Sequence, residues 1–248
     1  MLMKKVPGHV LHGYEAAYKL EKQKSKEGKS ETGMFSGIIM FLKYPYVFGI
    51  FGMVFFYEVA ATVLSYLRLE VAQSNSTSLS EVTSFLFKIT FAYHFVGFLI
   101  ALIGTTALMK WLGERICLVL IPLVSGSLLL YLVASNTAPA ALIVAFVALK
   151  AINYAFSWPV RESLYIPTVK EIKFKSKSWI DAFGTKFAKT GGSTFNVFAE
   201  YVGENMVFTA YCFFFAGIIA IWTFAAFLLG IRFEKAVEAK EVIGLEKE

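Results

Sequence analysis

The chain has 248 residues, of which 57% are hydrophobic and 17% are charged. Soluble domains contain about 45–50% apolar and about 25% charged residues, so this composition indicates an integral membrane protein. It excludes a disordered, collagen-like or disulfide-stapled chain. Cys117 and Cys212 both lie inside apolar runs, which is typical of buried thiols rather than of a redox pair or a metal site.

Six stretches have the length of about 20 mostly apolar residues that a helix needs to cross a bilayer. They cover residues 44–67, 84–109, 112–134, 138–158, 179–202 and 207–231. These solid runs do not alternate as the strands of a barrel do. We therefore predict an all-α integral membrane protein whose transmembrane domain, residues 34–231, has six helices. The fifth stretch is the least hydrophobic because it holds two lysines.

The basic residues predict the orientation of these helices. Most of the 24 Lys and Arg residues fall in a charged tail at 1–33, in a loop at 159–178, in a second tail at 232–248 and in short connections on the same side. Segments enriched in Lys and Arg stay in the cytoplasm, so both termini are predicted to be cytoplasmic. The tail 1–33 lacks the apolar segment of a signal peptide. This topology explains the pI of about 9.1 without nucleic-acid binding.

Two predicted spans carry a charge deep inside them. A charged side chain at the bilayer centre costs roughly 2.5–3.5 kcal/mol and usually faces a cavity. Glu58 lies in the first span and Lys150 interrupts the fourth, where Asn153, Ser157 and Arg161 share its helical stripe. Structural ion pairs are the alternative for both charges, with Glu58 paired to a lysine of another helix.

The fifth span has one polar face, about 100° wide on a helical projection. This face holds Thr185, Lys189, Gly192, Ser193, Asn196 and Glu200, with Lys186 at its edge, and the phenylalanines 183, 187, 195 and 198 fall opposite. Such a helix is suited to lining an aqueous cavity, and the glycines next to Lys189 allow a close backbone approach. The alternative is that Lys186 and Lys189 extend to the cytoplasmic surface.

The cationic loop 159–178 precedes this cationic helix face directly. Together they predict attraction of a polyanion from the cytosol, and phosphate-rich metabolites are the obvious class. The alternative is that the loop only marks the inner side of the membrane and contacts anionic lipid.

Residues 153–168, NYAFSWPVRESLYIPT, closely resemble the ATP:ADP antiporter family, the nucleotide transporters of plastids and obligate intracellular bacteria. Residues 170–181, KEIKFKSKSWID, and 183–193, FGTKFAKTGGS, continue the match. The resemblance implies a major-facilitator-like fold, of which this chain matches the C-terminal six-helix half. Because intramembrane lysines and glutamates are needed for transport in that family, it also implies transport roles for Glu58, Lys186 and Lys189.

These features predict a membrane nucleotide transporter, for ATP/ADP exchange or nucleotide import, in the inner membrane of a bacterium. The predicted substrate-binding residues are Glu58, Lys150, Asn153, Arg161, Lys186, Lys189 and Asn196. The cations would contact phosphates, and Glu58 would offset the lysines in the empty cavity or gate the two access states. Substrate sites of such folds lie between two halves, so the chain is a fragment, pairs with a separate half or forms a homodimer.

No enzyme, metal or cofactor is expected, since the three histidines do not cluster and no catalytic set is present. Two alternatives to a nucleotide transporter stay open: a major-facilitator-like carrier of another substrate, and a non-transporting membrane scaffold or remnant.

Overall fold

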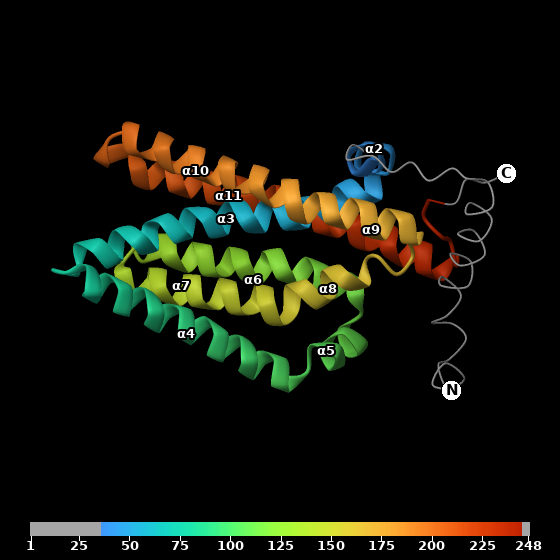
Figure 1. Cartoon of the computed structure of the whole chain (residues 1–248), viewed down its shortest axis with the longest axis horizontal. Helices are drawn as coiled ribbons and strands as arrows, with labels where there is room; N and C mark the ends of the chain where they lie inside the picture. The colour runs from blue at the N-terminus through green and yellow to red at the C-terminus, as the bar shows by residue number, and fades with distance from the viewer. Residues whose placement is uncertain (1–35, 245–248) are drawn as a thin grey trace.

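The computed structural model describes residues 36–244, which form a bundle of long helices along one axis (Figure 1). The helices are α2 (Ser36–Lys43), α3 (Pro45–Ser74), α4 (Leu79–Ile103), α5 (Thr105–Leu112), α6 (Glu114–Ala134), α7 (Pro139–Ile152), α8 (Trp158–Ser163), α9 (Lys170–Trp179), α10 (Thr185–Tyr201) and α11 (Glu204–Glu238). Two π-helical turns, η2 (Asn153–Ser157) and η3 (Ile180–Gly184), join α7 to α8 and α9 to α10. The predicted tail 1–33 lies outside the described residues.

Five helical segments are long and apolar enough to cross a membrane. They are Pro45–Ser74, Leu79–Leu102, Glu114–Ala134, Pro139–Ser163 and Met206–Glu238. This confirms the prediction of an all-α integral membrane protein. The remaining predicted span, 179–202, is helical and contacts α3, but α10 has only 17 residues and is more polar than the five.

The spans at both ends of the chain are longer than predicted. α3 continues to Ser74, so Arg68 belongs to the helix and not to the connection that follows it. α11 continues to Glu238, into the segment predicted as a tail at 232–248. Arginine can lie within a span because its long aliphatic stem packs against apolar groups. Arg68 does so here, with its guanidinium carbon 4.4 Å from the centre of the Phe146 ring.

The second predicted span, 84–109, is divided in the structure. α4 begins one turn earlier, at Leu79, where the Ser78 hydroxyl accepts a hydrogen bond of 3.3 Å from the Glu81 amide. It ends at Gly104, whose φ of 95° is a left-handed conformation that glycine adopts without strain. The apolar residues after Gly104 form a separate short helix, α5.

The predicted loop 159–178 is helical over most of its length. Pro159 has no N–H, so the carbonyl of Ala155, four residues earlier, lacks its usual helical donor. The backbone widens there into the π-turn η2, and the Ala155 carbonyl accepts a hydrogen bond from the Thr105 hydroxyl of α5. Tyr165 and its neighbours then connect α8 to α9.

α3 is central in the bundle and contacts α10, α11 and α7. In Figure 1, α10 and α4 lie at opposite edges, and α6 and α11 pack against each other. Gly192 allows α10 to approach α3 closely, because a Cβ atom there would lie 2.9 Å from the Thr62 Cβ and 2.9 Å from the Val59 carbonyl oxygen. The core between the helices is apolar, and Trp222 and Phe146 are among its largest fully buried side chains.

Polar contacts join the helices at one end of the bundle, the end at which α5, α8, α9 and the end of α11 lie (Figure 1). Arg115 of α6 pairs with Glu234 of α11 at 2.8 Å. The C-terminal segment also folds back onto the α8–α9 connection, since the Ile243 amide donates to the Pro167 carbonyl at 2.7 Å. The Tyr46 hydroxyl donates to the Leu164 carbonyl at 2.6 Å.

Candidate functional site

Glu58 lies near the middle of the 30-residue helix α3, which contacts α10 and α7. Thr62, one turn later, meets α10 at Gly192. Tyr57, one residue earlier, faces α7, where the Lys150 Nζ lies 5.6 Å from its ring centre. Because Glu58 lies near the middle of a candidate span and its side chain is only 19% exposed, this carboxylate needs a partner.

Lys189 of α10 is that partner. Its Nζ lies 3.7 Å from Glu58 Oε2, and its side chain is 52% exposed. The expected alternative for Glu58, a pair with a lysine of another helix, is therefore present in the structure. An exposed pair at this distance contributes little to stability, so Lys189 lies near Glu58 without being tightly held and stays accessible to a ligand.

Lys150 of α7 has aromatic neighbours. Its Nζ lies over the rings of Tyr57 and Phe146, 5.6 and 5.9 Å from their centres, and such cation–π contacts stabilise a desolvated ammonium. Among the side chains that the structure describes, no carboxylate lies within salt-bridge distance of Lys150, although Glu58 is close enough to act on it electrostatically. The ammonium is therefore placed by rings and keeps its hydrogen-bond donors for another group.

Asn153 and Arg161 lie further along the same helical segment. The Arg161 Nη2 donates to Asn153 Oδ1 at the long distance of 3.5 Å, and the buried Arg161 Nε has no hydrogen-bond partner. Burial, together with the nearby charges of Asp181 and Glu162, raises the pKa of Tyr165 well above its usual value, so this neighbouring hydroxyl stays neutral. Arg161 thus has donor capacity that the described residues do not use.

Two further residues belong to this region and were not among the predicted site residues. Arg68 of α3 acts electrostatically on Lys150 and has a buried Nε without a partner. Tyr57 is buried, and its hydroxyl also lacks a partner. Arg68 was missed because the first span was predicted to end at residue 67, whereas the position of Tyr57 next to Glu58 was a usable signal.

We call Glu58, Arg68, Lys150, Arg161 and Lys189 the cationic cluster. Four of these five side chains are cations, and electrostatic contacts link each of them to Glu58 or to Lys150. Asp181 is the further carboxylate that acts on Arg161. Positive charge is therefore in excess, and within residues 36–244 no group of three His, Cys, Asp or Glu residues is placed to hold a metal ion. The chemistry available is the binding of an anion.

The two remaining predicted residues lie apart from this cluster. Lys186 is exposed about one turn before Lys189, and no described contact joins it to the cluster. Asn196 is buried about two turns beyond Lys189, and this residue borders a cavity between α3, α10 and α11. The predicted polar face of α10 is thus divided, because Gly192 and Asn196 pack inward while Lys189 and Ser193 stay exposed.

Three comparisons with known proteins bear on this site. The chain is 25% identical over 241 residues to ADP,ATP carrier protein 1 of Chlamydia trachomatis. The match covers 88% of this chain but 45% of that carrier, so the chain spans less than half of its length. No protein-family model matches the chain, and no solved structure matches it. The similarity supports the resemblance to the ATP:ADP antiporter family.

Proposed function

We propose that this protein is a membrane transporter for nucleotides, which exchanges ATP for ADP or imports nucleotides. The observation that carries this proposal is the cationic cluster, in which Lys189, Lys150 and Arg161 act on Glu58 inside the bundle and Arg68 acts on Lys150. ATP carries three to four negative charges, and moving it into a low-dielectric region requires a matching number of cations and hydrogen-bond donors. The Chlamydia relative is named as an ADP,ATP carrier, which points to the same substrates.

The cluster has the unused donors that phosphate oxygens require. The Lys150 ammonium rests on two rings, and the Arg161 Nε has no acceptor. In the empty protein Glu58 holds Lys189 at 3.7 Å. A phosphate group that approaches would take Lys189 from Glu58, since each lysine is a point charge suited to phosphate. Glu58 would hold Lys189 again once the nucleotide has left.

Tyr154 favours a nucleotide over another anion. This residue follows Lys150 by about one turn, is 53% exposed, and has its ring 6.0 Å from that of Tyr93 and 5.8 Å from that of His94. An exposed ring offers a face on which a base can stack. The cationic cluster beside the ring of Tyr154 fits a ligand that has both phosphates and a base, whereas a simple anion would use the cationic cluster alone.

The exposure of the cationic cluster also supports a second protein chain that covers it. Lys189 is 52% exposed, and a charge that met lipid at this depth would cost roughly 2.5–3.5 kcal/mol. A separate six-helix half or a second copy of this chain would enclose the cationic cluster instead. The 45% coverage of the Chlamydia carrier fits this arrangement.

The test is exchange of labelled ADP against internal ATP in proteoliposomes. The chain is reconstituted alone and together with a six-helix counterpart, and both samples are compared with the Lys189→Ala variant. We expect uptake that requires internal nucleotide, is suppressed by unlabelled ATP, and is lost in Lys189→Ala. Uptake that ignores ATP indicates a carrier of another substrate, and absence of both uptake and ATP binding in every sample indicates a scaffold.

A further inference from the structure

A groove of about 560 Å³ lies between α6 and α11. It is lined by one residue of α6 and four residues of α11, which are Val119, Ala220, Thr223, Phe224 and Phe227. The α11 residues follow one another at helical spacing, so they form one stripe along the helix. Apart from Thr223, the side chains that line the groove are apolar, which makes it a place for a hydrocarbon chain.

The groove lies between two close contacts of α6 with α11. At the first contact, a Cβ atom on Gly126 would lie 2.8 Å from the Ile219 Cγ2, and at the second, a Cβ atom on Gly230 would lie 2.9 Å from the Arg115 Cγ. The two contacts are 11 residues apart on each helix, which is about 16 Å at 1.5 Å per residue. The residues that line the groove fall between them in both helices.

The lining of the groove is exposed on helices that are suited to a bilayer. α6 and most of α11 are long and apolar enough to cross a membrane. Phe224 is 62% exposed and Phe227 is 44% exposed. In a membrane these rings would meet acyl chains, so the groove is open to lipid along its length.

Arg115 and Glu234 lie at one end of the groove. Arg115 precedes Val119 by one turn of α6, and its guanidinium carbon lies 5.5 Å from the centre of the Phe227 ring. Glu234, about two turns beyond Phe227, accepts a hydrogen bond of 2.8 Å from the Arg115 Nη1. This contact uses one nitrogen and one oxygen, and the two side chains are 40% and 45% exposed. Both signs of charge are therefore accessible where the apolar groove ends.

The position along the helices places this charged end at the level of lipid headgroups. Arg115 is the second residue of α6, and Trp111 in the preceding helix is 82% exposed, as is typical of tryptophan at the membrane interface. Ala220 and Glu234 are 14 residues apart, which is about 21 Å at 1.5 Å per residue. One leaflet with its headgroups is about 20–22 Å thick. The groove and its charged end thus have the length of one lipid molecule.

We propose that this groove binds one phospholipid whose headgroup carries a phosphate and a primary ammonium, as in phosphatidylethanolamine. An acyl chain lies against Phe224 and Phe227, the phosphate accepts hydrogen bonds from Arg115, and the ammonium donates to Glu234. A phosphatidylglycerol headgroup would satisfy Arg115 and leave Glu234 beside a like charge. A choline headgroup has no N–H to donate to Glu234.

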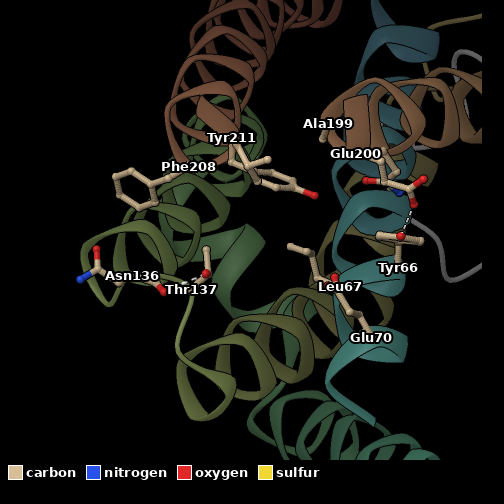
Figure 2. A pocket seen from close by; sticks show the side chains of 11 residues that line it. Tyr66, Leu67, Glu70, Asn136, Thr137, Ala199, Glu200, Phe208 and Tyr211 are labelled. Carbon is tan, nitrogen blue, oxygen red and sulfur yellow. Dashed lines mark hydrogen bonds between the residues drawn. The ribbon is translucent and has the colours of Figure 1, made fainter. Parts of the chain in front are cut away.

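The lipid would join α6 to α11 at a place apart from the other sites. The cationic cluster lies on other helices. The cavity of Figure 2 borders α11 at Phe208 and Tyr211, at least nine residues before Ala220. The proposal is therefore independent of nucleotide transport.

The test is native mass spectrometry of the full chain in detergent after incubation with an equimolar mixture of three lipids. Phosphatidylethanolamine, phosphatidylcholine and phosphatidylglycerol with identical acyl chains are the probes. We expect one phosphatidylethanolamine to stay bound, with a preference of about tenfold over each of the others, because a hydrogen bond to a charged group distinguishes them. Glu234→Gln should retain phosphatidylethanolamine and phosphatidylcholine equally, and Arg115→Gln should retain less of all three lipids.

A further variant leaves the ion pair intact. Ala220→Phe places a ring in the groove and should lower the retention of phosphatidylethanolamine about tenfold. The matched control is Ile221→Phe, which enlarges an exposed α11 side chain outside the lining of the groove and should retain the lipid fully. Equal retention of the three lipids, a preference for phosphatidylglycerol, or the same retention in Ala220→Phe and Ile221→Phe overturns the proposal.

Discussion

Replacing Glu58 with Gln is expected to tighten ATP binding and slow exchange. In the empty protein, Lys189 must leave Glu58 before it can meet a phosphate oxygen. At the 3.7 Å that separates Nζ from Oε2, Coulomb's law gives about 4.5 kcal/mol at an effective dielectric constant of 20 and about 1.1 kcal/mol in water. Because Lys189 is 52% exposed, the value near water applies.

A cost of about 1 kcal/mol that disappears in Glu58→Gln corresponds to about fivefold tighter binding of ATP. Affinity is measured by titration of the purified protein with labelled ATP, and exchange in proteoliposomes. The matched control is Glu234→Gln, which breaks the 2.8 Å pair with Arg115 between α6 and α11 and should leave ATP affinity unchanged. Weaker or unchanged ATP binding in Glu58→Gln would refute the role of this carboxylate as a competitor of the phosphates.

Three further substitutions test the cationic cluster, the contact between α10 and α3, and the ring of Tyr154. Lys150→Met should weaken ATP binding about tenfold. The Tm should stay equal or rise, because the substitution removes a desolvated charge that has no described salt-bridge partner. ATP affinity and Tm are measured on the same preparation, and a large fall in Tm would contradict this. Gly192→Ala should destabilise the protein by about 1–3 kcal/mol, since its Cβ would lie 2.9 Å from the Thr62 Cβ. In the control Gly191→Ala the added Cβ would lie no closer than 3.9 Å to another atom, so this variant should gain about 0.5–1 kcal/mol from the higher helix propensity of alanine, and denaturant titrations measure both changes. Tyr154→Ala should lower the affinity for ATP more than that for inorganic triphosphate, and Tyr154→Phe should restore the difference, as competition assays with both ligands will report.

The apolar spans were predictable because lipid forces long uninterrupted helices on the chain. Their exact ends were not, since local packing decides them. Arg68 extends α3 by covering the ring of Phe146, and the break at Gly104 lies in an apolar run that reads as continuous. A hydropathy profile reports neither the contact of Arg68 with Phe146 nor the helix break at Gly104.

The candidate site was predictable in its residue types and less so in its pairings. A charge inside a span stands out in any sequence, which is why Glu58, Lys150 and Lys189 were identified. The contact between Glu58 and Lys189 joins residues 131 positions apart, and only the packing of α10 on α3 brings them together. Asn196 shares a helical face with Lys189 but lies about two turns away, and that distance along the axis places it beside Glu200 and apart from the cationic cluster.

The close approach at Gly192 also constrains how the site responds to a ligand. α10 lies on α3 at Gly192 with no space for a side chain between them, so we expect the two helices to keep their separation and, with it, the backbone distance between Glu58 and Lys189. Opening of their ion pair then needs only a change of side-chain rotamer, which takes picoseconds to nanoseconds, whereas a helix displacement takes microseconds or longer. We therefore expect the pair to open faster than α10 can leave α3.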